Sequence, residues 1–375
     1  MNFSASQLAT KPHYPILDGL RGVAAVMVVF FHIFEIFSGG DHTKQFINHG
    51  YLAVDFFFLL SGFVIGHAYN DRWGQMSLKQ FFKRRLIRLH PMIIMGMTIG
   101  ALCFYFSASQ KLFPLVADTS FWKLGIVMLL GYLLLPVTIP MDIRGWQEMY
   151  PLNGPAWSLF FEYIANLVYA LVLRKASTKV LAVLTFLSAA WLIYYTVTST
   201  GGDVIGGWSI NAEQLKIGFT RLAFPFLAGL LLHKIFSPIK LSNAFFWCSI
   251  LVIAILSVPR IGGHHYLWQN GIYDATAIII LFPLVVYLGA SGSIKNKITK
   301  KCCTFLGELS YPVYMVHFPI TYVFYAWVVN NNVPLEQAWP IGLMVFVVSI
   351  ALAYLCLKLY DMPLRKWLIK RGIHD

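Results

Sequence analysis

LDGLRGVAAVMVVFFHIF, residues 17–34, is apolar over nearly its whole length but carries Asp18 and Arg21 near one end and His32 near the other. Its apolar run is close to the ~20 residues that a helix needs to cross a hydrocarbon core about 30 Å thick. Eleven helical residues complete three turns and about 20° more, so Arg21 and His32 share one face, about 16 Å apart along the axis. The stretch predicts a membrane helix with two polar residues aligned on it.

Charged side chains are costly at the centre of a bilayer, by about 2.5–3.5 kcal/mol on insertion scales, so they usually line a cavity or meet a partner. A purely structural interpretation is that Arg21 reaches the lipid headgroups and His32 is a hydrogen-bonded core residue. Two such residues on one face favour a polar cavity instead. Glu35, one turn beyond His32, is either a residue that orients the imidazole ring or a solvated residue at the helix end.

The rest of the chain has the composition of a membrane protein. Only 12% of the 375 residues are charged, against about 25% in soluble domains. The net charge of +13 is therefore assigned to cytoplasmic loops and not to nucleic-acid binding. The five cysteines lie in apolar segments or in a lysine-rich loop, without disulfide or metal-ligand spacing. We expect an all-α, polytopic helical bundle that forms one domain over residues 1–375 and holds no metal.

The charge of the linkers sets the number of crossings. Linkers rich in Lys and Arg face the cytoplasm, and two on the same side need an even number of crossings between them. Three apolar segments separate the basic linker 70–91 from 174–179, so one of the three does not cross. Segment 122–139 carries Pro136 and lies between proline-bearing linkers, so we expect it to be re-entrant or interfacial. About ten crossings remain, with both termini cytoplasmic. The apolar segments are 20–38, 51–69, 92–109, 122–139, 156–173, 179–198, 217–236, 243–259, 272–290, 304–329 and 339–360.

Further polar residues interrupt the apolar segments at different depths. Trp157, Ser158 and Glu162 open one segment at its expected outer end, and Asp55 interrupts another. Such a set predicts a polar cavity that runs across the bilayer, lined by side chains from several segments. The remaining members of this set are Arg221, Ser310, Tyr311, Tyr314 and His317.

The basic linker 70–91 allows two interpretations. Arg84, Arg85 and Arg88 fall within about a third of a helical circumference. They either anchor the chain to anionic lipid or bind a phosphate, because a guanidinium pairs with phosphate oxygens in a bidentate way. A phosphate site beside a polar cavity suits a nucleotide-bearing substrate from the cytoplasm.

Six short motifs, in this order, resemble the acyltransferase 3 family of integral membrane acyltransferases over nearly the whole chain. The last of them has Asp361 where the family more often has Glu, which weakens any role for that residue. The motifs are LDGLRGVAAVMVVFFH (17–32), AVDFFFLLSGFVI (53–65), FFKRRLIRLHP (81–91), NGPAWSLFFE (153–162), LGELSYPVYMVHFPI (306–320) and YDMPLRKW (360–367).

The resemblance implies transfer of an acyl group, acetyl first, from acyl-CoA to a hydroxyl of a glycan, a lipid-linked saccharide or a small acceptor. His32 is then the catalytic base, acting with Arg21 and Glu162, and Arg84, Arg85 and Arg88 bind the CoA phosphates. Glu162 and Trp157 are expected at the outer mouth where the acceptor arrives. The polar set of Asp55, Ser158, Ser310, Tyr311, Tyr314 and His317 lines the path. A covalent acyl-enzyme on Ser158 or Ser310 is the alternative to direct transfer.

The resemblance also implies a bacterial inner-membrane protein, in the form that lacks a fused SGNH hydrolase-like domain. Two other functions remain open. A transporter of a polar or anionic solute would also have polar residues in its spans, although it predicts inverted repeats that the sequence does not display. Another class of membrane acyltransferase, with an Asn/His pair, would lack the Arg-x10-His opening of residues 21–32.

Overall fold

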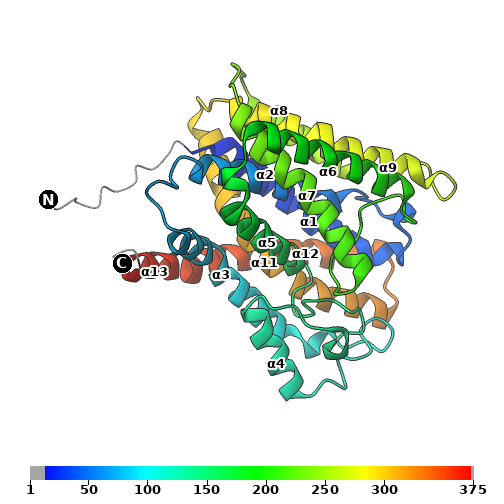
Figure 1. The fold of residues 1–375 in the computed structure, drawn as a ribbon. Coiled ribbons are helices and arrows are strands. Elements are labelled where there is room, and N and C mark those ends of the chain that lie inside the picture. Colours follow the sequence, from blue (N-terminus) through cyan, green and yellow to red (C-terminus); the bar gives the residue numbers. More distant parts are fainter. Residues whose placement is uncertain (1–12, 373–375) are drawn as a thin grey trace.

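The computed structural model describes residues 13–372, which form thirteen α-helices joined by loops and short helical turns (Figure 1). Two π-helical turns, Ala277–Leu281 and Cys356–Asp361, continue α9 into α10 and α12 into α13. The helices are α1 Pro15–Glu35, α2 Ala53–Tyr69, α3 Leu78–Cys103, α4 Phe121–Tyr132, α5 Ala156–Leu171, α6 Thr178–Thr198, α7 Ala212–Ile235, α8 Ala244–Ser257, α9 Leu267–Thr276, α10 Phe282–Ser291, α11 Lys297–Asn331, α12 Leu335–Leu355 and α13 Met362–Gly372.

Helix length and hydropathy confirm the all-α membrane bundle. Among the described residues, 8 helical stretches are long and apolar enough to cross a membrane, and α4, α5 and α8 are shorter apolar helices. Each apolar segment of the sequence contains one of these helices, although α4 covers only the first part of segment 122–139. The 12 residues of α4 span about 18 Å, well short of a hydrocarbon core. The topology of segment 122–139 and the count of ten crossings stay predictions.

The core of the bundle depends on glycines that let helix backbones touch. A Cβ on Gly22 of α1 would lie 2.4 Å from the carbonyl oxygen of Leu306 in α11. A Cβ on Gly62 of α2 would lie 2.2 Å from that of Phe226 in α7. Lipid tails are as apolar as the helices, so the hydrophobic effect does not bring membrane helices together. Small residues favour their association because they allow close van der Waals packing. The pairs α1–α11 and α2–α7 therefore form the centre on which the site is built.

The loop between α4 and α5, residues 133–155, folds back against the bundle and does not extend away from it. Arg144 fixes it from within: Nε donates to the Pro151 carbonyl at 2.5 Å, and the guanidinium lies 3.7 Å from the ring centre of Tyr322 in α11. The loop also pairs with the α6–α7 connection, because the Met149 amide donates to the Trp208 carbonyl at 2.7 Å. Two loops far apart in sequence thus close one end of the bundle together.

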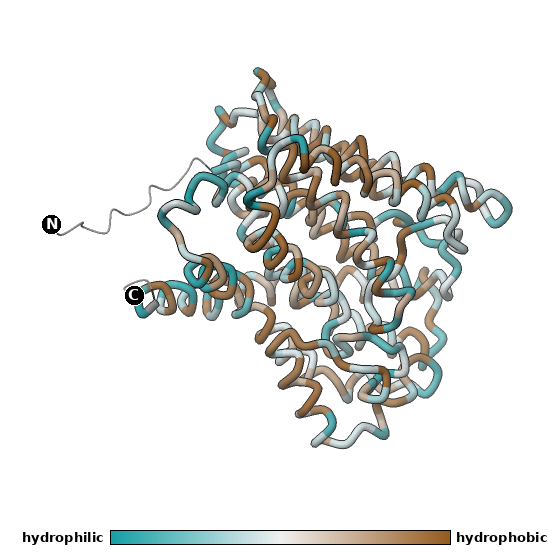
Figure 2. The backbone as a smooth tube through the Cα atoms, in the orientation of Figure 1, coloured by the Kyte–Doolittle hydropathy of each residue, from teal (hydrophilic) through white to brown (hydrophobic). Residues whose placement is uncertain are grey.

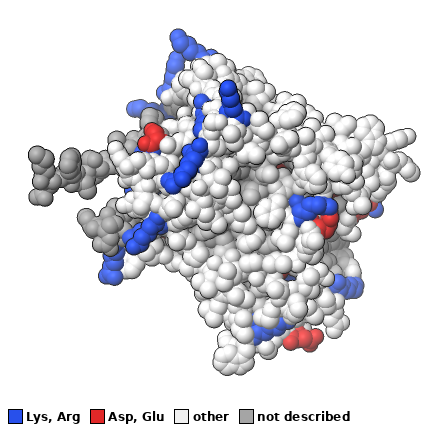
Figure 3. All heavy atoms as spheres, viewed as in Figure 1, with Lys and Arg blue, Asp and Glu red and all other residues white. Residues whose placement is uncertain are grey.

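The two ends of the bundle differ in charge. Apolar residues follow the middle of the helices, whereas polar residues gather in the loops at both ends (Figure 2). The start of α1 and the whole of α13 lie on the left in Figure 1, and Lys and Arg side chains gather along the left and upper left of the same view (Figure 3). This is the end where the positive-inside rule expects the cytoplasm.

Candidate active site

Two cavities enter the bundle and meet at its centre. The first, which we name the arginine cavity, has a volume of about 450 Å³ and is lined by residues that include Arg21, Arg85 and Arg88. The second, the histidine cavity, has a volume of about 400 Å³ and is lined by residues that include His32 and Glu35. Arg21 and His32, which the sequence aligns on one face of α1, therefore line different cavities.

Tyr314 of α11 separates the two cavities. Tyr314 and Val54 line both of them. The Tyr314 hydroxyl lies 2.7 Å from the Ser158 Oγ of α5 and 3.2 Å from the Pro155 carbonyl oxygen, so α5 holds the phenol ring in place. The sequence predicted one continuous cavity, and the structure has instead two cavities with a tyrosine at their boundary.

His32 is held by a carboxylate in the histidine cavity. Its Nδ1 lies 2.9 Å from Glu35 Oε2, and the Tyr325 hydroxyl donates to the same oxygen at 3.0 Å and also to the His32 carbonyl. A carboxylate on Nδ1 favours the tautomer whose proton is on that nitrogen, which leaves Nε2 as the lone-pair nitrogen. Among the described residues Nε2 has no hydrogen-bond partner. The arrangement is that of an oriented general base.

His317 lies behind His32, outside the lining of both cavities. The two imidazole rings stack with their centres 5.5 Å apart and their planes at 28°. His317 is fully buried, and its Nδ1 donates to the Val313 carbonyl at 2.9 Å. The prediction that His317 lines the path is therefore corrected: α11 turns this side chain toward the back of the base.

Arg21 is held in the arginine cavity by its neighbours. Its Nη2 lies 2.8 Å from Asp18 Oδ1, and its Nε donates to the Ser310 Oγ of α11 at 3.0 Å. His13 pairs with the other oxygen of Asp18 at 2.7 Å. The hydrogen bond to Asp18 raises the pKa of His13, which lies before α1. Arg21 thus ties α1 to α11 at the cavity wall.

Glu162 lies on the other side of the boundary from its expected position. The sequence placed it with Trp157 at the outer mouth, but Glu162 lines the arginine cavity and Trp157 the histidine cavity. Five helical residues rotate by about 140° and advance about 7.5 Å along α5, which separates the two side chains. Glu162 Oε1 pairs with Arg85 Nη2 at 2.5 Å and accepts from the Ser61 hydroxyl at 3.0 Å.

The arginines of the basic linker differ in what they face. A capping box between Ser77 and Gln80 starts α3 just before them. Arg85 and Arg88 then point into the arginine cavity, whereas Arg84 is not among its lining residues. Arg85 is paired with Glu162, and Arg88 is exposed with no carboxylate within ion-pair distance in the described part of the chain. Arg88 is therefore the arginine left for an anionic ligand.

Asp55 is a structural partner and does not line either cavity. Its side chain is fully buried and accepts from Arg221 Nη2 of α7 at 2.7 Å. Arg221 lines the histidine cavity and lies 5.0 Å from the ring centre of Trp157. Removing one partner of such a buried pair costs about 3–5 kcal/mol. The predicted role of Asp55 in the path is thus replaced by holding Arg221.

Tyr311 and Asp361 shape the arginine cavity from its edge. The Tyr311 hydroxyl donates to the Leu89 carbonyl at 2.6 Å and so joins α11 to α3. Asp361 pairs with Arg365 one turn later at 2.6 Å, and both line this cavity. Arg365 therefore adds a further guanidinium to the cavity wall.

Glu148 and two tryptophans were missed by the sequence analysis. Glu148, Trp146 and Trp208 line the histidine cavity from loops, where helical periodicity offers no signal. Glu148 accepts from the Tyr322 hydroxyl at 2.6 Å, and its burial raises the pKa of its carboxyl to about 7. In the sequence, the one sign that Glu148 could lie near the site is that it comes five residues before Asn153, the first residue of the motif 153–162. With Trp157, the tryptophans form an aromatic wall around His32.

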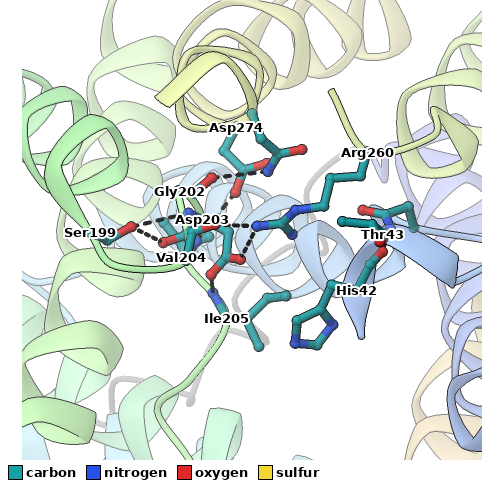
Figure 4. Close-up of polar contacts among 12 residues, drawn as sticks. His42, Thr43, Ser199, Gly202, Asp203, Val204, Ile205, Arg260 and Asp274 are labelled. Carbon is teal, nitrogen blue, oxygen red and sulfur yellow. Dashed lines mark hydrogen bonds and ion pairs between the residues drawn. The ribbon is translucent and has the colours of Figure 1, made fainter. Parts of the chain in front are cut away.

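A polar network holds the loop 199–211 over the histidine cavity (Figure 4). Arg260 Nη2 pairs with Asp203 Oδ2 at 2.7 Å, and the Val204 amide donates to Asp274 Oδ2 of α9 at 3.2 Å. Asp274 also accepts from the Tyr51 hydroxyl at 2.9 Å. Tyr51 lines the histidine cavity. The network therefore fixes both the loop and one wall of the cavity.

No metal site accompanies these groups. Within residues 13–372, no three His, Cys, Asp or Glu side chains lie together in a way that could hold a metal ion.

The chain is similar to a protein family and to several known proteins. A family model described as an acyltransferase domain matches residues 14–358. "Protein 2 in picA locus" of Rhizobium radiobacter is 34% identical over 187 residues, which are 48% of this chain and 92% of that protein. O-acetyltransferase OatA of Staphylococcus aureus is 22% identical over 378 residues, which are 97% of this chain and 59% of that protein.

A further protein, of Staphylococcus aureus strain COL, also carries O-acetyltransferase in its name. It is 24% identical over 378 residues, which are 96% of this chain and 58% of that protein. The chain thus spans about three fifths of the length of these staphylococcal relatives. No solved structure matches it.

Proposed function

Since the chain belongs to the acyltransferase 3 family, whose model matches residues 14–358, we propose that it is an integral membrane O-acyltransferase that moves an acetyl group from acyl-CoA to an acceptor hydroxyl. One observation carries the proposal. A cavity lined by arginines and a cavity that holds the His32–Glu35 pair meet at a single tyrosine, Tyr314. An anionic donor and a neutral acceptor can therefore approach one point from opposite sides.

The arginine cavity is the donor site in this proposal. Arg88 has no carboxylate partner among the described residues, and Arg365 lines the same cavity beside Asp361. Guanidinium groups suit the pyrophosphate of CoA, because they donate two parallel hydrogen bonds to phosphate oxygens. The charge at this end of the bundle supports a cytoplasmic face and cytoplasmic termini. The bacterial relatives support a bacterial inner membrane.

The histidine cavity is the acceptor site. The acceptor hydroxyl attacks the thioester carbonyl carbon, and a C–O bond forms as the C–S bond breaks. His32 Nε2 takes the hydroxyl proton, with Glu35 stabilising the imidazolium, and returns a proton to the departing CoA thiolate. The hydroxyls of Tyr314 and Ser158 lie at the boundary of the cavities. To stabilise the oxyanion that forms on the carbonyl oxygen, one of them has to turn its proton away from the Pro155 carbonyl that it faces in the structure.

The acceptor is a hydroxylated molecule that fits an aromatic cavity. Trp146, Trp157 and Trp208 provide flat apolar faces, while Glu148 and His32 provide polar groups. A sugar ring presents both kinds of surface, so a glycan or a lipid-linked saccharide suits this wall better than a purely apolar molecule. The O-acetyltransferase names of the staphylococcal relatives support acetyl as the transferred group.

The test compares His32→Ala with the exposed control His265→Ala in purified full-length protein. We expect His32→Ala to lower the rate of CoA release from acetyl-CoA by about 10²-fold or more, and Glu35→Gln to lower it less. The Kd for acetyl-CoA should stay within about twofold of the parent, because the donor lies in the other cavity. The measurements are mass-spectrometric detection of CoA and equilibrium binding.

Unchanged turnover by His32→Ala would show that His32 is not the catalytic base. A protein that binds no acetyl-CoA and releases no CoA would favour the transporter instead, since a transporter of a polar solute has no reason to recognise a thioester.

A further inference from the structure

A third cavity lies beside the arginine cavity, between the start of α11 and the end of α12. It has a volume of about 520 Å³, and we name it the lysine groove. Its lining residues from α11 recur at intervals of three and four, so they occupy one face of that helix. Tyr354 and Lys358 form the opposite wall. The residues from α11 are Lys297, Lys300, Lys301, Thr304, Phe305 and Glu308.

The charge of the groove is not neutralised within the protein. Lys358 pairs with Glu308 at 3.0 Å. In the described part of the chain, no carboxylate lies within ion-pair distance of Lys297, Lys300 or Lys301, and all three are exposed. Three ammonium groups therefore stand around one concave surface with the capacity to bind an anion.

The lysine groove is continuous with the arginine cavity. Thr304 and Glu308 line both of them, so one face of α11 passes from one cavity into the other. Measured along α11, Tyr314 is about 15 Å from Thr304 and about 20 Å from Lys300 and Lys301. A ligand that reaches from the boundary of the two substrate cavities to the lysines must therefore be long and must carry its negative charge at the far end.

Coenzyme A has this shape. Its thioester ends a long pantetheine arm, the pyrophosphate lies at the other end of that arm, and the ribose beyond carries a separate 3′-phosphate. We propose that the lysine groove binds the 3′-phosphate of the acyl-CoA donor, while the arginine cavity holds the pantetheine arm and the pyrophosphate. This inference rests on the proposed function. It gives a binding site to the 3′-phosphate end of the donor, which lies beyond the arginine cavity.

Lysine suits the 3′-phosphate for a chemical reason. An ammonium group is a compact point charge with three donors, so several lysines can surround a terminal phosphate monoester without the planar geometry that arginine requires. A phospholipid headgroup offers the same chemistry, and basic pockets between membrane helices do bind such lipids. The continuity with the arginine cavity favours the donor, and the experiment separates the two sources.

The test measures the Kd of CoA and of dephospho-CoA, which lacks only the 3′-phosphate, for the full chain in an uncharged detergent. We expect the parent to prefer CoA by about tenfold. In the double variant Lys300→Ala/Lys301→Ala the preference should fall below about twofold, with the affinity for dephospho-CoA nearly unchanged. The control variants Lys179→Ala and Lys240→Ala remove exposed lysines outside the groove and should keep the preference of the parent. Rising salt should reduce that preference, because exposed charges are screened.

Three results would overturn the inference. Equal affinity of the parent for CoA and dephospho-CoA would show that the 3′-phosphate is not bound, and the proposed function would stand. A preference that survives in the double variant would place the phosphate elsewhere. If the double variant instead loses only the stabilisation by phosphatidylglycerol, relative to phosphatidylcholine, the groove is a lipid site. Binding of neither nucleotide would count against the proposed function itself.

Discussion

The charged residues in the membrane-spanning helices divide into those with partners in the protein and those without. Arg21 pairs with Asp18, and Arg221 pairs with Asp55. A buried charge with a partner affects the stability of the fold, because removal of the partner leaves an uncompensated charge in a medium of low polarity. Arg88 and the Nε2 of His32 have no such partner in the described residues. We assign Arg88 to the donor and the Nε2 of His32 to the acceptor.

The sequence identified many of the polar residues that line the two cavities but not their partners. The spacing of Arg21 and His32 placed both on one face of α1, and in the structure they line two different cavities. Asp55 looked like a path residue, because its partner Arg221 is more than 160 positions away. Glu148 left no periodic signal, since it reaches the cavity from a folded loop. Long-range pairing and loop conformation are tertiary properties, so a single sequence does not determine them.

Glu148 predicts a dependence of stability on pH. Its burial raises the pKa of its carboxyl from 4.5 to about 7, despite the hydrogen bond from Tyr322 and the charge of Arg144, which lower it, while Asp142 and Glu35 raise it further. The folded state then binds more protons than the unfolded state between pH 4.5 and 7. Stability from this group is present below pH 4.5 and is lost as pH rises through 7.

We expect the apparent Tm of the parent to fall between pH 5 and pH 8 by more than that of Glu148→Gln, which cannot titrate at this position. The control is Glu336→Gln, which changes an exposed glutamate at the start of α12 and should retain the slope of the parent. Thermal unfolding in detergent at several pH values measures the difference. Parallel curves for the parent and Glu148→Gln would contradict the assignment.

At the scale of the helices, hydropathy predicted which residues form the helices. It did not predict how the helices pack or which side chains they turn into each cavity. Each apolar segment of the sequence contains a helix, because a stretch of about 20 apolar residues has few other structures in lipid; in segment 122–139 the helix ends at Tyr132. The rotation of each helix depends on its packing, and a shift of five residues along α5 was enough to move Glu162 into the arginine cavity. The division into two cavities follows from Tyr314, whose ring position no sequence pattern specifies.

The contact between α2 and α7 predicts the effect of a single methyl group. Gly62→Ala would place a Cβ 2.2 Å from the backbone oxygen of Phe226, so the helices must separate. Overpacking of this kind costs about 1–3 kcal/mol, and α7 carries Arg221 into the histidine cavity. We expect a lower apparent Tm together with reduced turnover.

The matched control is Gly125→Ala in α4, where an added Cβ meets nothing within 4 Å. It should leave both Tm and turnover near the parent values. A Gly62→Ala protein with the stability of the control would show that the close helix crossing does not hold the bundle together.

At the scale of the whole molecule, the two cavities define a direction. The arginine cavity and the lysine groove share Thr304 and Glu308 near the start of α11, and Lys and Arg gather along the left and upper left of the molecule in Figure 3. The histidine cavity opens among the loops that Arg144 and Arg260 hold together. In the function that we propose, a membrane placed across the helices would separate the pool of acyl-CoA from the pool of acceptor. The acyl group alone has to pass Tyr314.

We propose that the acetyl group crosses the membrane through this protein, and transfer across sealed vesicles tests this. The purified chain is reconstituted, acetyl-CoA labelled in its acetyl group is supplied on one side only, and vesicles oriented in each direction are compared. We expect CoA to remain on the side where acetyl-CoA was supplied. The labelled acetyl group, as acetate or on an added hydroxylated acceptor, should appear on the other side, and His32→Ala should abolish its appearance there. Label and CoA released together on the donor side, at the same rate with and without His32, would contradict it.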